Sequence, residues 1–140
     1  MNEPSGSSDP TVLRSLAVTT GDVVTALEAN RRASRGAVLR VTPPFYGRMR
    51  ARIHLEGAES ADYDDPKPLH IDPESFVTDG APTYPEVDET RPDPYDVDEH
   101  HERHQTAVEA WRRSIRRYLR DTVDVPAPSG PHTVEAKYLG

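Results

Sequence analysis

The sequence predicts one α+β domain, with a small antiparallel sheet and two or three helices packed on one face of it. The length of 140 residues fits a single domain. Apolar and polar residues alternate strictly over 48–55, as in a half-buried strand, and apolar residues recur at helical spacing over 97–122. Hairpins combined with packed helices favour an antiparallel sheet that is covered on one side. We expect a disordered tail over 1–10 and one domain over 11–140.

The composition limits the class of protein. Hydrophobic residues make up 34% of the chain and aromatic residues 6%, and 14 prolines and 8 glycines interrupt it. Cysteine is absent, which excludes disulfides and thiolate metal sites. No apolar run is long enough for a membrane helix, and the N-terminus lacks the features of a signal peptide. We therefore expect a soluble, cytoplasmic protein without a membrane partner, whose oligomeric state stays open.

Charge is arranged in three blocks along a chain whose net charge is −7. Residues 31–52 contain seven arginines and no acidic residue. Residues 57–102 contain fifteen acidic residues, one lysine and one arginine, and residues 103–120 contain six arginines and one glutamate. Lysine is rare and aspartate abundant, at two and thirteen residues. This usage is typical of proteins from a salt-rich cytoplasm or from a GC-rich genome.

The first elements are a strand and a helix. We expect the strand over 11–18 and the helix over 21–34. Thr19 and Thr20 offer capping hydroxyls at the start of the helix, and Gly36 follows its end.

A hairpin follows, and it carries the clearest signal in the sequence. Its two strands are the alternating runs 38–42 and 48–55, which a turn of about six residues connects. Alternate side chains of a strand lie on the same side. We therefore expect Arg48, Arg50 and Arg52 to project together, with His54 beyond them and Arg40 beside them on the paired strand.

The acidic, proline-rich loop of about 57–96 is predicted to hold little regular structure. Within it, 68–71 reads as a short strand, and Asp72 with Pro73 reads as the start of a short helix. Residues 79–96 form a connector that should run over the surface.

The last elements are a long helix and a strand. The helix is expected over 97–122, with an apolar stripe through His101, His104, Val108 and Trp111. Alternation over 134–138 predicts the final strand.

The arginine face of the hairpin is the first candidate site. Four guanidinium groups on one face repel one another unless an anion neutralises them, and their planar donors fit phosphate or carboxylate. Aromatic residues at the turn could stack on bases. Three interpretations remain open: the acidic segment of this chain covers the face, nucleic acid binds it, or an acidic protein binds it. The candidate contact residues are Arg40, Phe45, Tyr46, Arg48, Arg50 and Arg52.

A histidine cluster on the long helix is the second candidate. His100 and His101 lie four and three residues before His104, so either pair could chelate a metal such as zinc, nickel or copper, with Glu102 or His70 completing the site. The spacing departs from that of zinc proteases. The competing interpretation is that the cluster forms hydrogen bonds at the edge of the core. We expect no cofactor outside this metal alternative.

These observations favour a non-catalytic binding or adaptor module that uses the arginine face. The chain lacks a phosphate-binding glycine loop and a nucleophile elbow. The alternative is a small metal-binding protein or metal-dependent enzyme that uses the histidine cluster. A third hypothesis is that the acidic segment acts as an autoinhibitory cover over the arginine face.

Three segments carry a resemblance to known sequences. They are LRVTPPFYGRMRAR at 39–52, PLHIDP at 68–73, and the stretch from HHERH to Trp111 and Arg112. Together they resemble a family of small uncharacterised proteins from halophilic archaea. The resemblance implies a cytoplasm rich in potassium salt, and it carries no activity, cofactor or catalytic residue.

Overall fold

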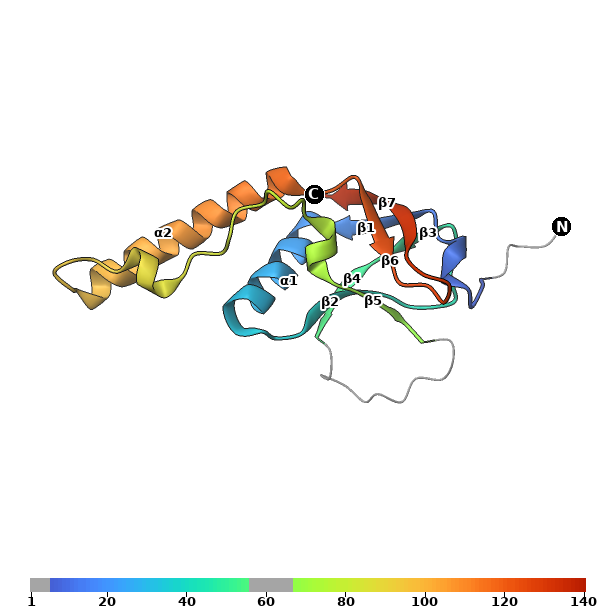
Figure 1. The fold of residues 1–140 in the computed structure, drawn as a ribbon, viewed down its shortest axis with the longest axis horizontal. Coiled ribbons are helices and arrows are strands. Elements are labelled where there is room, and N and C mark those ends of the chain that lie inside the picture. The colour runs from blue at the N-terminus through green and yellow to red at the C-terminus, as the bar shows by residue number, and fades with distance from the viewer. Residues whose placement is uncertain (1–5, 56–66) are drawn as a thin grey trace.

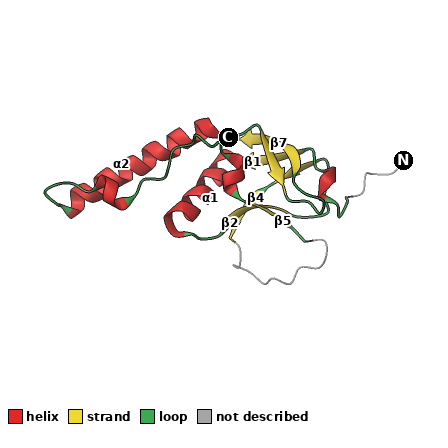
Figure 2. Cartoon of the chain, in the orientation of Figure 1, coloured by secondary structure: helices red, strands yellow, loops and turns green. Residues whose placement is uncertain are grey.

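The computed structural model of this chain describes residues 6–55 and 67–140. Within these residues the chain forms two α-helices and two small sheets, which confirms the α+β class (Figures 1 and 2). No helix in this part of the chain is long and apolar enough to cross a bilayer. The first residues of the expected tail, and most of the polar loop expected at 57–67, lie outside the described residues.

The described chain contacts the domain from its first residues. Ser7 N donates a hydrogen bond to Phe45 O over 2.8 Å, and Phe45 N donates to Ser7 O over 2.7 Å. A 3-10 helix, η1 (Pro10–Val12), occupies the beginning of the expected first strand, because the Asp9 carboxylate caps it. The strand itself, β1, begins later and spans Ser15–Thr19.

The first helix, α1 (Thr20–Ala33), agrees closely with its prediction. The Thr19 hydroxyl accepts a hydrogen bond from Asp22 N over 3.0 Å, as expected of a capping residue. The helix ends at Ser34, whose φ of 49° places it in the left-handed region before Gly36.

The alternating run after the turn keeps its pattern but divides between two sheets. β4 (Arg52–Leu55) pairs antiparallel with β2 (Ala37–Val41), which is the expected hairpin. β3 (Arg48–Arg50) instead pairs parallel with β1 in the other sheet. Ala51 lies at the change of partner, where its side chain is fully buried and its N–H donates to Ala17 O over 2.9 Å.

The two sheets differ in how their strands pair. The three-stranded sheet, in the order β4-β2-β5 with β5 at Leu69–Ile71, is antiparallel as predicted. The four-stranded sheet has the order β3-β1-β7-β6, in which β6 spans Thr122–Val125 and β7 spans His132–Leu139. β1 is parallel to both of its neighbours, and β6 is antiparallel to β7. The last strand is confirmed, whereas β6 was not predicted and begins at Thr122, the last residue of the predicted helix.

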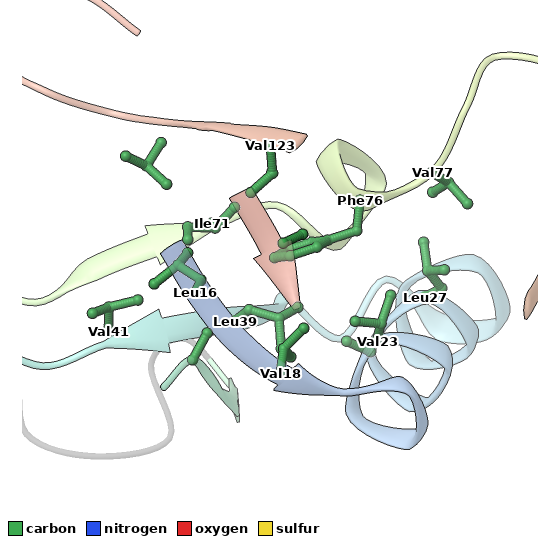
Figure 3. Packing of buried hydrophobic residues seen from close by; sticks show 14 of the residues in the cluster. Leu16, Val18, Val23, Leu27, Leu39, Val41, Ile71, Phe76, Val77 and Val123 are labelled. Carbon is green, nitrogen blue, oxygen red and sulfur yellow. The ribbon is translucent and has the colours of Figure 1, made fainter. Parts of the chain in front are cut away.

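One core joins the two sheets to α1 (Figure 3). Leu16 and Val18 from β1 meet Leu39 from β2, and Leu27 from α1 and Phe76 complete the cluster, all of them fully buried. Because successive strand residues point to opposite faces, the alternate residues of β3, β6 and β7 lie on the outer surface, whereas in β2 Val38 is buried as well.

An arm extends away from the sheets (Figure 1). It consists of α2 (Val97–Ile115) and of the connector, which contains the 3-10 helix η3 (Val87–Thr90) and runs alongside α2. Before the connector, the expected short helix is present as η2 (Pro73–Phe76). After α2, the turn η4 (Arg116–Tyr118) ends the helix earlier than predicted, since Leu119 forms an antiparallel bridge with Val77 and β6 begins at Thr122.

Candidate functional site

Three arginines form a row on the outer surface where β3 and β4 meet. Arg48, Arg50 and Arg52 are exposed, while Ala51 between them is buried and Ile53 packs against the core. The predicted alternation therefore holds across the change of sheet, and it points all three arginine side chains outward.

A fourth arginine lies beside this row on β2. Arg40 stands directly opposite Arg52 on β4 and opposite His70 on β5. Its Nη1 lies 3.5 Å from Nε2 of His54, and the rings of His54 and His70 are 5.5 Å apart between centroids. Arg40 and Arg52 thus place two guanidinium-bearing side chains directly opposite each other in the three-stranded sheet. We call Arg40, Arg48, Arg50 and Arg52 the arginine ridge.

The described acidic residues do not cover this ridge. The side chains of Arg48, Arg50 and Arg52 form no hydrogen bond or ion pair with any described residue. The connector at 79–96, which was the expected cover, lies along α2 instead, where Pro82 O accepts a hydrogen bond from the Trp111 indole. The connector therefore does not lie over the exposed ridge arginines, and the autoinhibitory hypothesis stays a prediction, since residues 56–66 of the acidic loop lie outside the described residues.

A hollow of about 440 Å³ borders the ridge on the four-stranded sheet. Its floor is formed by the small side chains Ser15 and Ala17 of β1, and Arg48 lines one side. On the other side Lys137 forms an ion pair with Glu135 over 3.0 Å, and both of these side chains are exposed. A ligand could thus lie low against the sheet beside the arginines.

The two aromatic residues of the turn have different positions. Phe45 is 2% exposed and pairs with Ser7, so it belongs to the core and cannot stack on a base without leaving it. Tyr46 is 43% exposed and remains available. The expectation of two stacking residues is therefore reduced to one.

A buried carboxylate joins the two helices, and sequence reasoning missed it. Glu28 of α1 accepts hydrogen bonds from Arg112 of α2 over 2.7 and 2.8 Å and from the Tyr84 hydroxyl over 2.9 Å. The hydrogen bonds from Arg112 hold the pKa of Glu28 below its usual value, against the effect of burial. Burial, with the hydrogen bond to Glu28, raises the pKa of Tyr84 to about 12. The sequence did contain a signal for this contact, because Glu28 lies one turn after Val24 on the apolar face of α1, where a carboxylate needs a partner.

Comparison with known proteins places the chain in a family. A family model described as Domain of unknown function (DUF8009) matches residues 2–140. The chain belongs to this DUF8009 family. Neither a curated protein nor a solved structure matches it. The family is uncharacterised, as the sequence resemblance implied, so the function of this DUF8009 chain has to be argued from its own residues.

Two of the candidate histidines hold the arm of the DUF8009 chain together. His100 is buried, its Nε2 donates to Val87 O over 2.8 Å, and its Nδ1 lies 3.2 Å from the Tyr95 hydroxyl. His104 Nδ1 lies 3.1 Å from the Thr90 hydroxyl. Both rings thus fasten the connector to α2, which corresponds to the competing interpretation of hydrogen bonds at the edge of a packed face.

The structure does not bring the proposed metal ligands together. His101, rather than His100, was expected on the buried stripe, but His101 is exposed. His70 belongs to the three-stranded sheet and His104 to the arm. Among residues 6–55 and 67–140, no group of three or more histidine, aspartate or glutamate side chains is arranged to hold a metal ion.

Proposed function

We propose that the chain is a non-catalytic binding module of the cytoplasm that contacts nucleic acid through the arginine ridge. One observation carries this proposal. Arg48, Arg50 and Arg52 stand in one outward row, and their side chains have no hydrogen-bonding or ion-pairing partner among the described residues. Exposed arginines that the fold itself does not use are available for an external anion.

The spacing of the row suits a chain of phosphates better than a single small anion. Arg48 and Arg50 are alternate residues of β3, about 7 Å apart, and Arg52 follows two residues further on at the start of β4. Each guanidinium presents a planar fork that can bind a phosphate with two hydrogen bonds. A phosphate backbone offers repeated negative charges to such a row.

Recognition through this surface should depend little on base sequence. Phosphate contacts position a nucleic acid without reading its bases. Tyr46 is an exposed aromatic residue shortly before Arg48 in the sequence, and the hollow over Ser15 and Ala17 offers small side chains. These features favour binding of the backbone with limited stacking.

The composition supports a salt-rich cytoplasm as the setting, with two lysines against fifteen arginines. At about 1 M salt the screening length falls to about 3 Å, so diffuse attraction between charges is lost. Close arginine–phosphate contacts persist under these conditions better than distant charges do. The ridge, rather than the overall charge of −7, would then determine binding.

The test is binding of labelled single-stranded RNA and duplex DNA, measured by fluorescence anisotropy at about 0.1 M and about 2 M KCl. The test variant carries Arg48→Gln, Arg50→Gln and Arg52→Gln. The control, with the same loss of charge, carries Arg35→Gln, Arg113→Gln and Arg117→Gln, which are exposed positions outside the ridge.

We expect the ridge variant to lose binding and the control to keep it. For single strands the slope of log affinity against log salt should fall in magnitude by roughly 2, because three phosphate contacts disappear. Equal binding by the two variants would contradict the proposal. Failure of the unmodified protein to bind at about 0.1 M KCl would overturn it and leave an acidic protein as the partner class.

A further inference from the structure

A groove between α1 and α2 gathers three further arginines. It encloses about 360 Å³ and is lined by Arg32, Arg112 and Arg116, with Thr25 and Glu28 beside them. None of these residues belongs to the arginine ridge.

The charged side chains come from facing turns of the two helical segments. Glu28 and Arg32 lie one turn apart on α1. Arg112 lies in the last turn of α2, and Arg116 follows in η4. The groove therefore contains three guanidinium groups and one carboxylate.

The carboxylate of the groove, Glu28, already accepts hydrogen bonds from within the chain. Arg112 binds both oxygens of Glu28, and Tyr84 donates to one of them as well. Arg32 and Arg116 form no hydrogen bond with the described residues and are exposed. Two positive charges in the groove thus remain without a hydrogen-bonded counter-charge within the described chain.

We propose that this groove binds a small polyvalent phosphate anion. Arg112 is held in place by Glu28, so part of its orientation is settled before binding, and its Nη1 still carries free donors. Arg32 supplies a guanidinium fork from α1 and Arg116 supplies one from η4, and Thr25 of α1 also lines the groove. This inference is independent of the proposed function, because it uses a separate set of residues.

The test is isothermal titration calorimetry with potassium pyrophosphate in about 0.1 M KCl. We expect saturable binding of one pyrophosphate to each chain. The variant Arg32→Gln/Arg116→Gln should bind about 100-fold more weakly, since one charge-assisted hydrogen-bonding group contributes roughly tenfold. The control Arg113→Gln/Arg117→Gln removes the same charge from neighbouring exposed positions and should bind nearly as well as the unmodified protein.

Two outcomes would overturn the inference: the absence of saturable binding by the unmodified protein, or an equal loss in the control variant. Arg32→Lys gives a second comparison, because it keeps the charge and removes the planar fork. It should bind pyrophosphate more weakly than the unmodified protein and more tightly than Arg32→Gln. Equal affinities for all three proteins would contradict a role for Arg32.

The two sites are distinguished with the same set of proteins. The triple glutamine variant of Arg48, Arg50 and Arg52 should keep its affinity for pyrophosphate. The Arg32→Gln/Arg116→Gln variant should keep its affinity for nucleic acid. If the ridge variant alone lost pyrophosphate binding, the anion would bind at the ridge and the groove would not be its site.

Discussion

Arg112 binds Glu28 through two donors, with Nε 2.7 Å from Oε1 and Nη2 2.8 Å from Oε2. The two residues are 84 positions apart in the sequence, and their contact joins α2 to α1. Tyr84 adds the connector to the same carboxylate, and its ring lies edge-on to Trp111 with centroids 5.0 Å apart. The base of the arm is therefore organised around one side chain.

The first prediction concerns this carboxylate. Glu28→Gln removes the charge that Arg112 pairs with and should lower the free energy of unfolding by about 1.5–3 kcal/mol, the range for a hydrogen bond to a charged group. Equilibrium unfolding in urea measures this free energy. Glu102→Gln is the control, because Glu102 is exposed on the same arm. Equal unfolding free energies for the two variants would show that the contact does not stabilise the fold.

The second prediction is an acid dependence of that stability. The pKa of Glu28 lies below its ordinary value of 4.5 in the folded protein, so folding favours the charged form. The stabilisation is present above the unfolded pKa and is lost as the pH falls through the folded pKa. The difference between the unmodified protein and Glu28→Gln should therefore shrink between about pH 6 and about pH 3. A difference that stays constant across this range would contradict the assignment.

The third prediction concerns alkaline pH and Tyr84. Its pKa is raised from 10.0 to about 12, so the folded state keeps the phenol proton longer than the unfolded state does. Its contribution to stability is complete below pH 10.0 and is lost as the pH rises toward about 12. Tyr84→Phe should lack this component. The thermal unfolding temperatures of the unmodified protein and of Tyr84→Phe are compared from about pH 9 upward. If both temperatures depended on pH in the same way, the effect would be ruled out.

The fourth prediction separates the two histidines at the start of α2. His100→Leu removes the hydrogen bond to Val87 O and the contact with Tyr95. Amide exchange in η3 should become faster, because η3 then loses the hydrogen bond that ties Val87 O to α2. His101→Leu is the matched control, since its side chain is exposed. If both variants accelerated exchange equally, His100 would not be the fastening residue.

Local features of the fold could be predicted from the sequence. The cap at Thr19, the helix start at Asp72 and the alternation around Ala51 each depend on a few neighbouring residues, and all three are present. Such signals arise from hydrogen bonds and side-chain directions within one or two turns of the chain. The outward direction of the ridge arginines follows from the same alternation.

Features that depend on distant partners could not be predicted in this way. β3 pairs with β1 rather than continuing the hairpin, and β6 forms because β7 provides it with a partner. Alternation of apolar and polar residues marks a strand but does not indicate which other strand it pairs with. The burial of Phe45 likewise depends on Ser7, which lies in the expected tail. Long-range pairing thus decided which candidate residues became core and which remained exposed.

The segment 48–55, which contributes β3 to one sheet and β4 to the other, also restricts the register of strand pairing. A shift of one residue in strand pairing would exchange the inner and outer side chains. Because β3 and β4 are separated only by Ala51, such a slip in one sheet would force the other to slip with it. Arginines would then replace Met49 and Ile53 against the core in both sheets at once. Correct register in one sheet therefore enforces correct register in the other. The ridge arginines stay on the outer surface because a slip would bury charged side chains in both sheets.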